Sequence, residues 1–283
     1  MNRQASPFQE AVDTIIEKSR QANPIHDEDY IGEDGLCYCH NCNTPKQMRV
    51  AELDGRIVPI KCQCQKEKAQ QQERERQQEQ LRKKCQELRQ RAFTDFHMRE
   101  WDFDHDDREN PRLSDALLRY VRQFESYYQT GTGILLYGTV GTGKSFSAAC
   151  VANAVINQGK SAFMTNFSRI LNELQSTHQR QEYIDRLCSY ALLVLDDLGM
   201  ERDSSYALEQ IYNIIDSRYR SRKPMIITTN LGLQEISRCP NTERRRIYDR
   251  ILERCYPIQV IGDSRRIMAA KKRHHEMKAA LGL

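Results

Sequence analysis

The chain has 283 residues, of which 29% are charged, with a formal net charge of +4 and ten cysteines. This length can hold one large domain and a smaller one, and the charge is too weak to indicate nucleic-acid binding by itself. No apolar stretch approaches the roughly 20 residues of a membrane span, and the N-terminus lacks a signal-peptide core. We therefore expect a soluble, cytoplasmic protein with no membrane partner.

The first predicted element is a short amphipathic helix. Ser6 and Pro7 form a helix-start signal, and Phe8, Val12, Ile15 and Ile16 follow at helical spacing. The apolar stripe of this helix suits two uses equally well, because it can pack on the cysteine-rich segment that follows or dock on another protein.

Half of the cysteines fall between residues 37 and 64. Cys39 and Cys42 form a C-x₂-C pair, Cys62 and Cys64 form a C-x-C pair, and nineteen residues separate the pairs. Two tight turns can each present two thiolates, and four sulfurs suit tetrahedral Zn²⁺. A closed site of this kind is structural, since it leaves no open position for catalysis.

The segment between the two pairs predicts a small hairpin, because Asp54-Gly55 lies between the apolar runs 50–53 and 56–60. Cys37 and His40 are spare ligand candidates. A reduced, metal-free cluster and structural disulfides stay open as alternatives. The remaining cysteines have the pattern of core or incidental thiols; they are Cys85, Cys150, Cys188, Cys239 and Cys255.

From residue 66 to 91 the chain is almost wholly Gln, Glu, Arg and Lys, with a sparse apolar repeat. This composition predicts a solvated helical linker, or a thin coiled coil. The expected domains are therefore a helix and Cys₄ module at 1–65, a polar helical linker at 66–92, and a larger domain at 93–283, whose motifs follow.

The most informative motif begins where the apolar run 134–137 ends and a helix-prone segment is about to start. The octapeptide 138–145 has the pattern G-x-x-x-x-G-K-[ST] of a nucleoside triphosphate site, in the strand–loop–helix context that the pattern requires. Backbone N–H groups can converge on phosphate oxygens there, while the lysine reaches the β and γ phosphates and the serine binds Mg²⁺. The predicted nucleotide residues are Gly138, Gly141, Thr142, Gly143, Lys144 and Ser145.

Further short apolar runs at 161–165, 191–195, 225–229 and 258–261 alternate with helix-length segments. This alternation predicts an α/β fold with a parallel sheet flanked by helices. A helix should also begin at Asn110-Pro111, just before the phosphate-loop unit.

Polar residues follow two of these runs at the edge where open α/β sheets bind ligands. Asp196 is expected to hold Mg²⁺ through water, and Asp197 to orient the attacking water. Asn230 ends another strand and can contact the γ-phosphate, although a helix cap is the alternative.

Arg246, Arg250 and Arg254 recur every four residues and so share one helix face. One of them could serve the ATP of a neighbouring subunit, which would make hydrolysis depend on self-association through the ATP sites. A solvated basic face is the alternative for Arg246 and Arg254. The basic segment 265–278 can likewise contact DNA phosphates or remain solvated.

Together these motifs resemble the AAA+ ATPases of the DnaC/DnaI helicase-loader and IstB-like family, over about residues 95–270. The resemblance implies an AAA+ P-loop NTPase fold. It assigns Asn230 as the sensor-1 residue, Arg250 as the arginine finger and Arg266 as the sensor-2 arginine. Ser204 and Tyr206 match positions that touch single-stranded DNA in that family, although Tyr206 could equally be a packing residue.

The resemblance also implies an ATP-controlled loader that delivers a hexameric replicative helicase onto single-stranded DNA, and loaders of the DnaI type carry an N-terminal cysteine module. Two departures matter. Asp197 stands where many AAA+ proteins have Glu, so we expect slow ATP hydrolysis, stimulated by DNA or a partner. About twenty residues follow the last predicted strand, which indicates a reduced lid.

Two other functions compete with the loader. An IstB-like transposition regulator would bind duplex DNA and a transposase. A zinc adaptor would use its ATP site only to stabilise folding.

Overall fold

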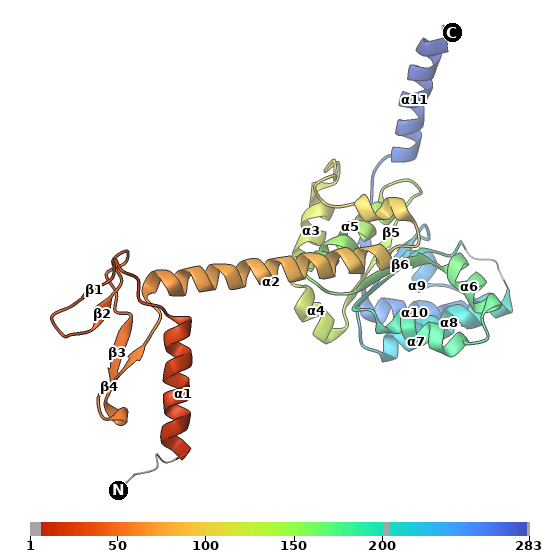
Figure 1. The fold of residues 1–283 in the computed structure, drawn as a ribbon. Coiled ribbons are helices and arrows are strands. Elements are labelled where there is room, and N and C mark those ends of the chain that lie inside the picture. The colour runs from red at the N-terminus through yellow and green to blue at the C-terminus, as the bar shows by residue number, and fades with distance from the viewer. Residues whose placement is uncertain (1–6, 201–203, 282–283) are drawn as a thin grey trace. The chain divides into compact units, whose positions relative to one another are not determined.

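The computed structural model describes residues 7–200 and 204–281. Contacts group the chain into two compact units, Met1–Gln80 and Leu81–Leu283, and the boundary falls within the long helix α2 (Gln63–Ala92). The predicted polar segment lies inside this helix (Figure 1). Within the described ranges, no helix has both the length and the apolar character that a membrane crossing needs.

The first unit consists of a helix and two small antiparallel sheets. Its elements are α1 (Pro7–Ala22), β1 (Tyr30–Ile31), β2 (Cys37–Tyr38), β3 (Gln47–Val50), the 3₁₀ turn η1 (Ala51–Leu53) and β4 (Arg56–Pro59). Helix α1 packs on β4, because Ile16 is buried and the Ser19 hydroxyl donates to the Pro59 carbonyl at 2.8 Å. Of the two predicted uses of this helix, the structure therefore shows packing within the module. Its predicted N-cap, Ser6, lies outside the described residues.

The predicted hairpin is present, but its turn is longer than expected. Strand β3 ends at Val50, and residues 51–53, expected to continue the strand, form a 3₁₀ turn. Asp54 and Gly55 both have positive φ, and the Gly55 N–H donates to the Val50 carbonyl. The turn thus needs five residues between the paired Val50 and Arg56.

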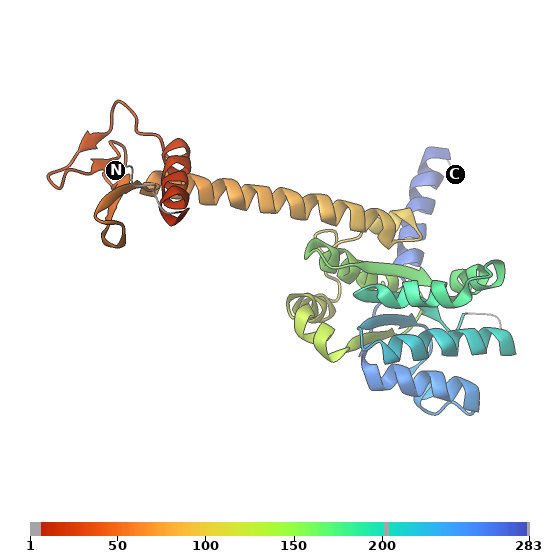
Figure 2. The same cartoon turned by 60° about the horizontal axis from the view of Figure 1, so that its bottom comes forward.

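The second unit contains the five-stranded parallel sheet that the alternation predicts, in the order β6-β7-β8-β5-β9. Figure 2 shows this sheet, coloured from yellow-green to blue, from a second side. The strands are β5 (Gly133–Tyr137), β6 (Ala162–Asn166), β7 (Leu192–Leu198), β8 (Met225–Thr229) and β9 (Cys255–Gln259). The helices are α3 (Pro111–Arg122), α4 (Phe124–Thr130), α5 (Lys144–Asn157), α6 (Phe167–Ser176), α7 (Arg180–Ser189), α8 (Ser205–Arg220), α9 (Leu233–Ser237), α10 (Thr242–Arg254) and α11 (Arg265–Leu281), with a 3₁₀ turn η2 (Phe96–Glu100).

Successive strand residues point to opposite faces of the sheet, and each face has its own apolar core. Leu136 and Val194 pack with α3 and α5, while Leu135 and Leu193 pack with α6, α7, α8 and α10. Because both faces are covered, the central strands are apolar throughout, which is why they stand out in the sequence.

Strand β9 differs from its prediction at 258–261. It pairs with β5 from Cys255 to Gln259, and Ile261, expected within the strand, is exposed. The strand lies at an edge of the sheet and mixes exposed with buried residues, so apolar character alone misplaces it by three residues at its start. Beyond it the described chain forms α11.

Candidate functional site

The phosphate-binding loop joins β5 to α5 and can be built only with glycine at key positions. Gly138 and Gly141 have φ of 141° and 85°. A Cβ on Gly138 would lie 2.5 Å from the Val260 carbonyl oxygen, and one on Gly141 would lie 2.2 Å from the Ser264 hydroxyl. The loop is therefore held tightly against the segment between β9 and α11, with its backbone free to face a ligand.

Lys144 begins α5 with its side chain folded into this loop. Its ammonium group donates to the carbonyls of Gly138 at 3.0 Å and Thr139 at 2.7 Å, and the Thr142 hydroxyl also donates to Thr139. Burial lowers the pKa of Lys144, while the nearby carboxylates of Asp196 and Asp197 act in the opposite direction. A lysine held here can exchange loop carbonyls for phosphate oxygens.

The two aspartates lie at the end of β7, where the strand is irregular. Asp196 is buried, and its Oδ1 accepts a 2.5 Å hydrogen bond from the Thr228 hydroxyl, which itself accepts from the Asp197 N–H at 2.9 Å. Asp197 has a φ of 59° within a register shift of the strand. Thr228 thus fixes both aspartates, a role that no sequence motif signals.

Burial raises the pKa of Asp196, against hydrogen bonds from Thr228 and Ser145 that favour its ionised form. The hydrogen bond to Ser145 brings together the two side chains predicted to hold Mg²⁺. Carboxylate and hydroxyl oxygens suit this cation, so the residues present fit the predicted site.

A cavity of about 740 Å³ lies over the loop. Of the predicted residues, its wall contains Gly141, Gly143, Lys144, Ser145, Asp197, Asn230 and Arg266. It also contains residues that the sequence analysis did not select, namely Trp101, Val140, Phe146, Met200, Arg265 and Arg273. Residues from five separate segments of the chain therefore meet at one cavity beside the carboxyl ends of β5, β7 and β8.

Trp101 and Phe146 form an aromatic corner of this cavity, with ring centroids 5.8 Å apart. The buried Asn153 amide on α5 donates to the carbonyls of Met98 and Trp101, at 2.9 and 2.8 Å, and so ties this turn to the helix that begins in the loop. In the sequence, only two features point to these residues as part of the site. Phe146 adjoins the glycine-rich motif, and Trp101 is the single tryptophan.

Arg265, which the sequence analysis named only within a basic segment, also lines the cavity. Its backbone N–H donates to the Gly141 carbonyl at 3.0 Å, and its guanidinium lies 2.9 Å from Asp107. The neighbouring Arg266 is more exposed and faces the same cavity. The first turn of α11 thus contacts the phosphate-binding loop directly.

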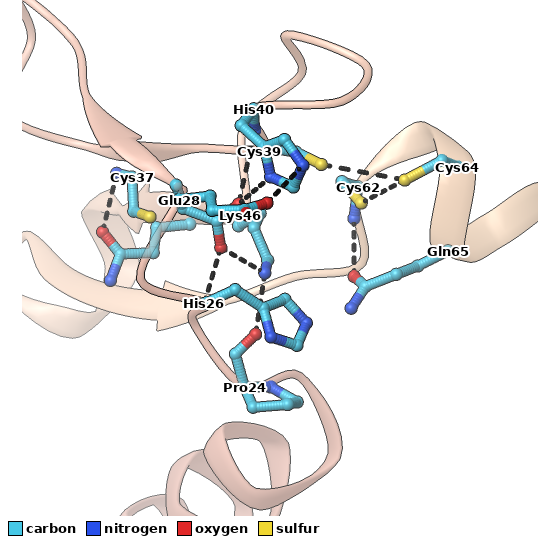
Figure 3. Close-up of polar contacts among 12 residues, drawn as sticks. Pro24, His26, Glu28, Cys37, Cys39, His40, Lys46, Cys62, Cys64 and Gln65 are labelled. Carbon is cyan, nitrogen blue, oxygen red and sulfur yellow. Dashed lines mark hydrogen bonds and ion pairs between the residues drawn. The ribbon is translucent and has the colours of Figure 1, made fainter.

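A separate cluster lies in the first unit, where all four predicted zinc ligands meet. The Sγ atoms of Cys39, Cys42, Cys62 and Cys64 all lie within 4.8 Å of one another. Figure 3 shows Cys39 and Cys62 beside Cys64, with sulfur separations from Cys64 of 3.7 and 3.2 Å. A tetrahedral Zn²⁺ with Zn–S bonds of about 2.3 Å separates its sulfurs by about 3.8 Å, so this geometry fits the ion.

The spare candidates lie differently. Cys37 is apart from the other sulfurs in Figure 3, and its backbone N–H donates to the Gln47 side chain. His40 faces the acidic side chains of Glu28 and Asp29. Asp29 is fully buried beside Lys46, with its oxygen 2.6 Å from the Lys46 nitrogen, and this pair supports the turn that carries Cys39.

The thiols do not have equal acidity. A hydrogen bond from the Thr44 hydroxyl lowers the pKa of Cys42 to about 5. Hydrogen bonding to Cys62 raises the pKa of Cys64 to about 12, and burial raises the pKa of Cys62. A thiolate at Cys42 offers a cation its first ligand.

The sequence model of the IstB-like ATP-binding proteins matches residues 61–274, most of the chain. The chain belongs to this family.

Relatives of two kinds share part of the sequence. An ATP-binding protein of a Mycobacterium tuberculosis insertion sequence is 30% identical over 130 residues, which are 45% of this chain and 51% of that protein. The replicative helicase loader DnaI of Bacillus subtilis is 28% identical over 167 residues, 53% of this chain and 54% of that protein. The chain spans about half the length of the curated relatives it matches.

Solved structures show the same fold. The crystal structure of DnaI matches with a TM-score of 0.53 at 23% identity, over 62% of this chain and 96% of that one. The structure of the DnaC helicase loader matches with a TM-score of 0.51 at 24% identity, over 58% and 99%. The predicted AAA+ fold and the resemblance to this family are thereby confirmed, and membership supports the predicted ATPase activity.

Six predicted residues of this IstB-like protein lie outside the wall of the cavity. Gly138 and Thr142 belong to the loop and Asp196 to the end of β7, whereas the other three lie on other elements. Arg250 on α10 is bound to Asp216 of the same chain. Ser204 caps α8, since its hydroxyl accepts from the Ala207 N–H at 3.1 Å. Tyr206 is half-buried, with the Arg180 guanidinium 5.9 Å from its ring centre. Ser204 therefore caps a helix, which requires no contact with DNA.

Proposed function

We propose that this chain is an ATP-dependent loader that delivers a hexameric replicative DNA helicase onto single-stranded DNA in the cytoplasm. The observation that carries the proposal is the pairing of a loader-like AAA+ domain with a separate module that gathers four cysteine sulfurs. Relatives that are named replicative helicase loaders support it.

The chain would hydrolyse ATP with the residues gathered at the loop. Lys144 would bind the β and γ phosphates, and Ser145 and, through water, Asp196 would hold the Mg²⁺ that balances phosphate charge. Asp197 accepts a hydrogen bond from the attacking water, and Asn230 orients the same water. As the water oxygen bonds to the γ-phosphorus, the bond from phosphorus to the bridging oxygen breaks. One proton of the water is released to solvent, and ADP and phosphate leave.

Hydrolysis should be slow, because the Asp197 side chain is one methylene shorter than Glu and its backbone is held in a left-handed conformation. Arg250 of one subunit would act at the ATP of the next, so that self-association completes the site. Ser204 and Tyr206, at the start of α8, would contact single-stranded DNA.

The cysteine cluster would hold one structural Zn²⁺ and so shape the surface that binds the helicase. A four-sulfur site has no open position, and none of its ligands lies in the ATPase unit. The zinc ion therefore acts on folding and partner binding, and ATP acts on the release of the partner.

The test mixes the full-length protein with the host's replicative helicase in ATP and Mg²⁺, and measures the mass of the complex during size exclusion. A stable co-complex is the expected result. If no complex forms with ATP, with ADP or without nucleotide, the loader proposal is wrong.

A transposition regulator is the second candidate, favoured by the insertion-sequence relative at 30% identity. It predicts filaments on double-stranded DNA and no helicase binding, which electron microscopy distinguishes from a discrete co-complex. The zinc adaptor predicts instead that the helicase binds while ATP hydrolysis stays undetectable with DNA and helicase present.

A further inference from the structure

Arg250 lies outside the wall of the cavity of its own chain, and side chains of α8 contact it. Its side chain is 26% exposed and lies between α10, which carries it, and α8. The two helices pack through Ile211 and Ile215 on one side and Ile247 and Ile251 on the other, in one buried cluster. The relative positions of groups on these helices are therefore fixed by the core.

Asp216 on α8 binds only one edge of the Arg250 guanidinium. Its Oδ1 lies 2.6 Å from Arg250 Nε, and its Oδ2 lies 2.8 Å from the guanidinium of Arg220. Among the described residues, no hydrogen bond uses the two terminal nitrogens of Arg250. A guanidinium presents five N–H donors in a fork, so this arrangement leaves its four terminal N–H donors available to an anion.

Two tyrosine rings lie close to the same guanidinium. The Arg250 carbon Cζ lies 4.8 Å from the ring centre of Tyr212 and 5.6 Å from that of Tyr219. The Tyr219 ring is itself held by a 2.7 Å hydrogen bond from its hydroxyl to Glu253. Stacking of this kind orients the guanidinium plane without occupying its donors.

We infer that Asp216 is a positioning residue for Arg250, which it holds in the orientation needed to meet the phosphates of ATP bound to a neighbouring copy of the chain. This inference rests on the proposed action of Arg250 between subunits. Asp216 touches neither ATP nor the reacting atoms. It acts by fixing the free end of Arg250 before the subunits meet, which reduces the ordering that the transition state would otherwise require.

The same substitution of Asp216 should have different effects in the two subunits that share an ATP site. Asp216 matters in the subunit that supplies Arg250, and is irrelevant in the subunit whose ATP is hydrolysed. A role in folding or assembly would make no such distinction, since every subunit must fold and assemble.

The experiment mixes two inactive variants of the full chain. Lys144→Ala subunits keep Arg250 and lose their own site, while Arg250→Ala subunits keep their site and lose the arginine. Their mixture should hydrolyse ATP. Adding Asp216→Ala to the Lys144→Ala subunits should lower the kcat of the mixture by about 10- to 100-fold with KM for ATP unchanged. Adding it to the Arg250→Ala subunits should leave both constants as they were.

Two further variants complete the design. Asp216→Asn retains the shape and one acceptor oxygen without the charge. It should therefore lower kcat only in the subunit that supplies Arg250, and by a smaller factor. If Asp216→Ala does not fold, Asp216→Asn tests the positioning role in its place. Glu209→Gln removes an exposed carboxylate from the same helix and should be silent in either subunit.

Equal losses in both positions, or no loss in either, would overturn the positioning role. If the mixture without Asp216 substitutions is inactive although mass measurement shows co-assembly, the shared site itself fails, and the positioning role fails with it.

Discussion

Burial of the Asp196 carboxylate makes the ligand-free protein less stable. Its folded pKa is raised above the usual 3.8, mainly by burial. At a pH between the pKa of the unfolded state and that of the folded state, the native state binds more protons than the unfolded state. Stability therefore falls as pH rises through this window and stays reduced above it. The group predicted to bind Mg²⁺ thus destabilises the fold while no cation neutralises it.

Asp196→Asn should therefore be at least as stable as the wild type without ligand at neutral pH, and less sensitive to pH as it rises above the usual carboxyl pKa of 3.8. It should also lose the stabilisation by Mg²⁺ and ATP, and its ATPase activity should fall by about 100-fold or more. Thermal unfolding at several pH values, with and without ligand, measures the first two effects. A ligand-free variant destabilised by more than about 1 kcal/mol would contradict the argument.

Trp101 provides a direct report on the cavity, because it is the only tryptophan and lies on the cavity wall. Its emission should change when a non-hydrolysable ATP analogue binds. Trp101→Ala should weaken binding by about tenfold if the base stacks on this ring, and Trp101→Phe should largely restore it. Calorimetric titration of the three proteins measures this order, and equal affinities would show that the ring does not contact the base.

At the scale of elements, the sequence predicts strands β5 to β8 to within a residue at their starts, because each is buried on both faces. Strand β9 is displaced because an edge strand mixes polar and apolar residues. The chemistry of the loop is also predictable, since its residues are contiguous. Thr228, Trp101 and Asp216 are not, because their partners lie far along the chain and only the fold brings them together.

The cysteine module has few other means of staying folded. Among residues 10–80, whose burial the structure describes, the buried apolar residues are Ile16, Pro59 and three cysteines, two of which are predicted ligands. Such a core is small for an independent unit, and structural zinc contributes on the order of 10 kcal/mol to modules of this kind. The zinc site and the fold of the first unit should therefore be a single cooperative element.

A strong chelator should accordingly unfold residues 30–64 and leave the ATPase unit folded, as amide hydrogen exchange can measure. The purified protein should contain about one zinc per chain. Cys62→Ser should lose this zinc, whereas Cys37→Ser, outside the sulfur cluster, should retain it. Loss of zinc from Cys37→Ser, or unchanged protection of the module after chelation, would refute the assignment.

At the scale of the whole molecule, the cavity of one chain lacks one of the side chains predicted for ATP hydrolysis. The cavity wall supplies Lys144, Asp197, Asn230 and Arg266, while the predicted finger, Arg250, is absent from it and bound to Asp216. A triphosphate at this cavity would thus be held by one subunit and lack the arginine that neutralises developing charge.

ATPase activity per subunit should consequently rise with protein concentration and reach a plateau when assembly is complete. Arg250→Ala should abolish this rise, and so should Arg250→Lys, because an ammonium group retains the charge but loses the fork that Asp216 and the tyrosines orient. Light scattering at the same concentrations measures the assembly itself. Activity per subunit that stays constant while assembly proceeds would show that each site works alone, and that Arg250 serves the interface without serving hydrolysis.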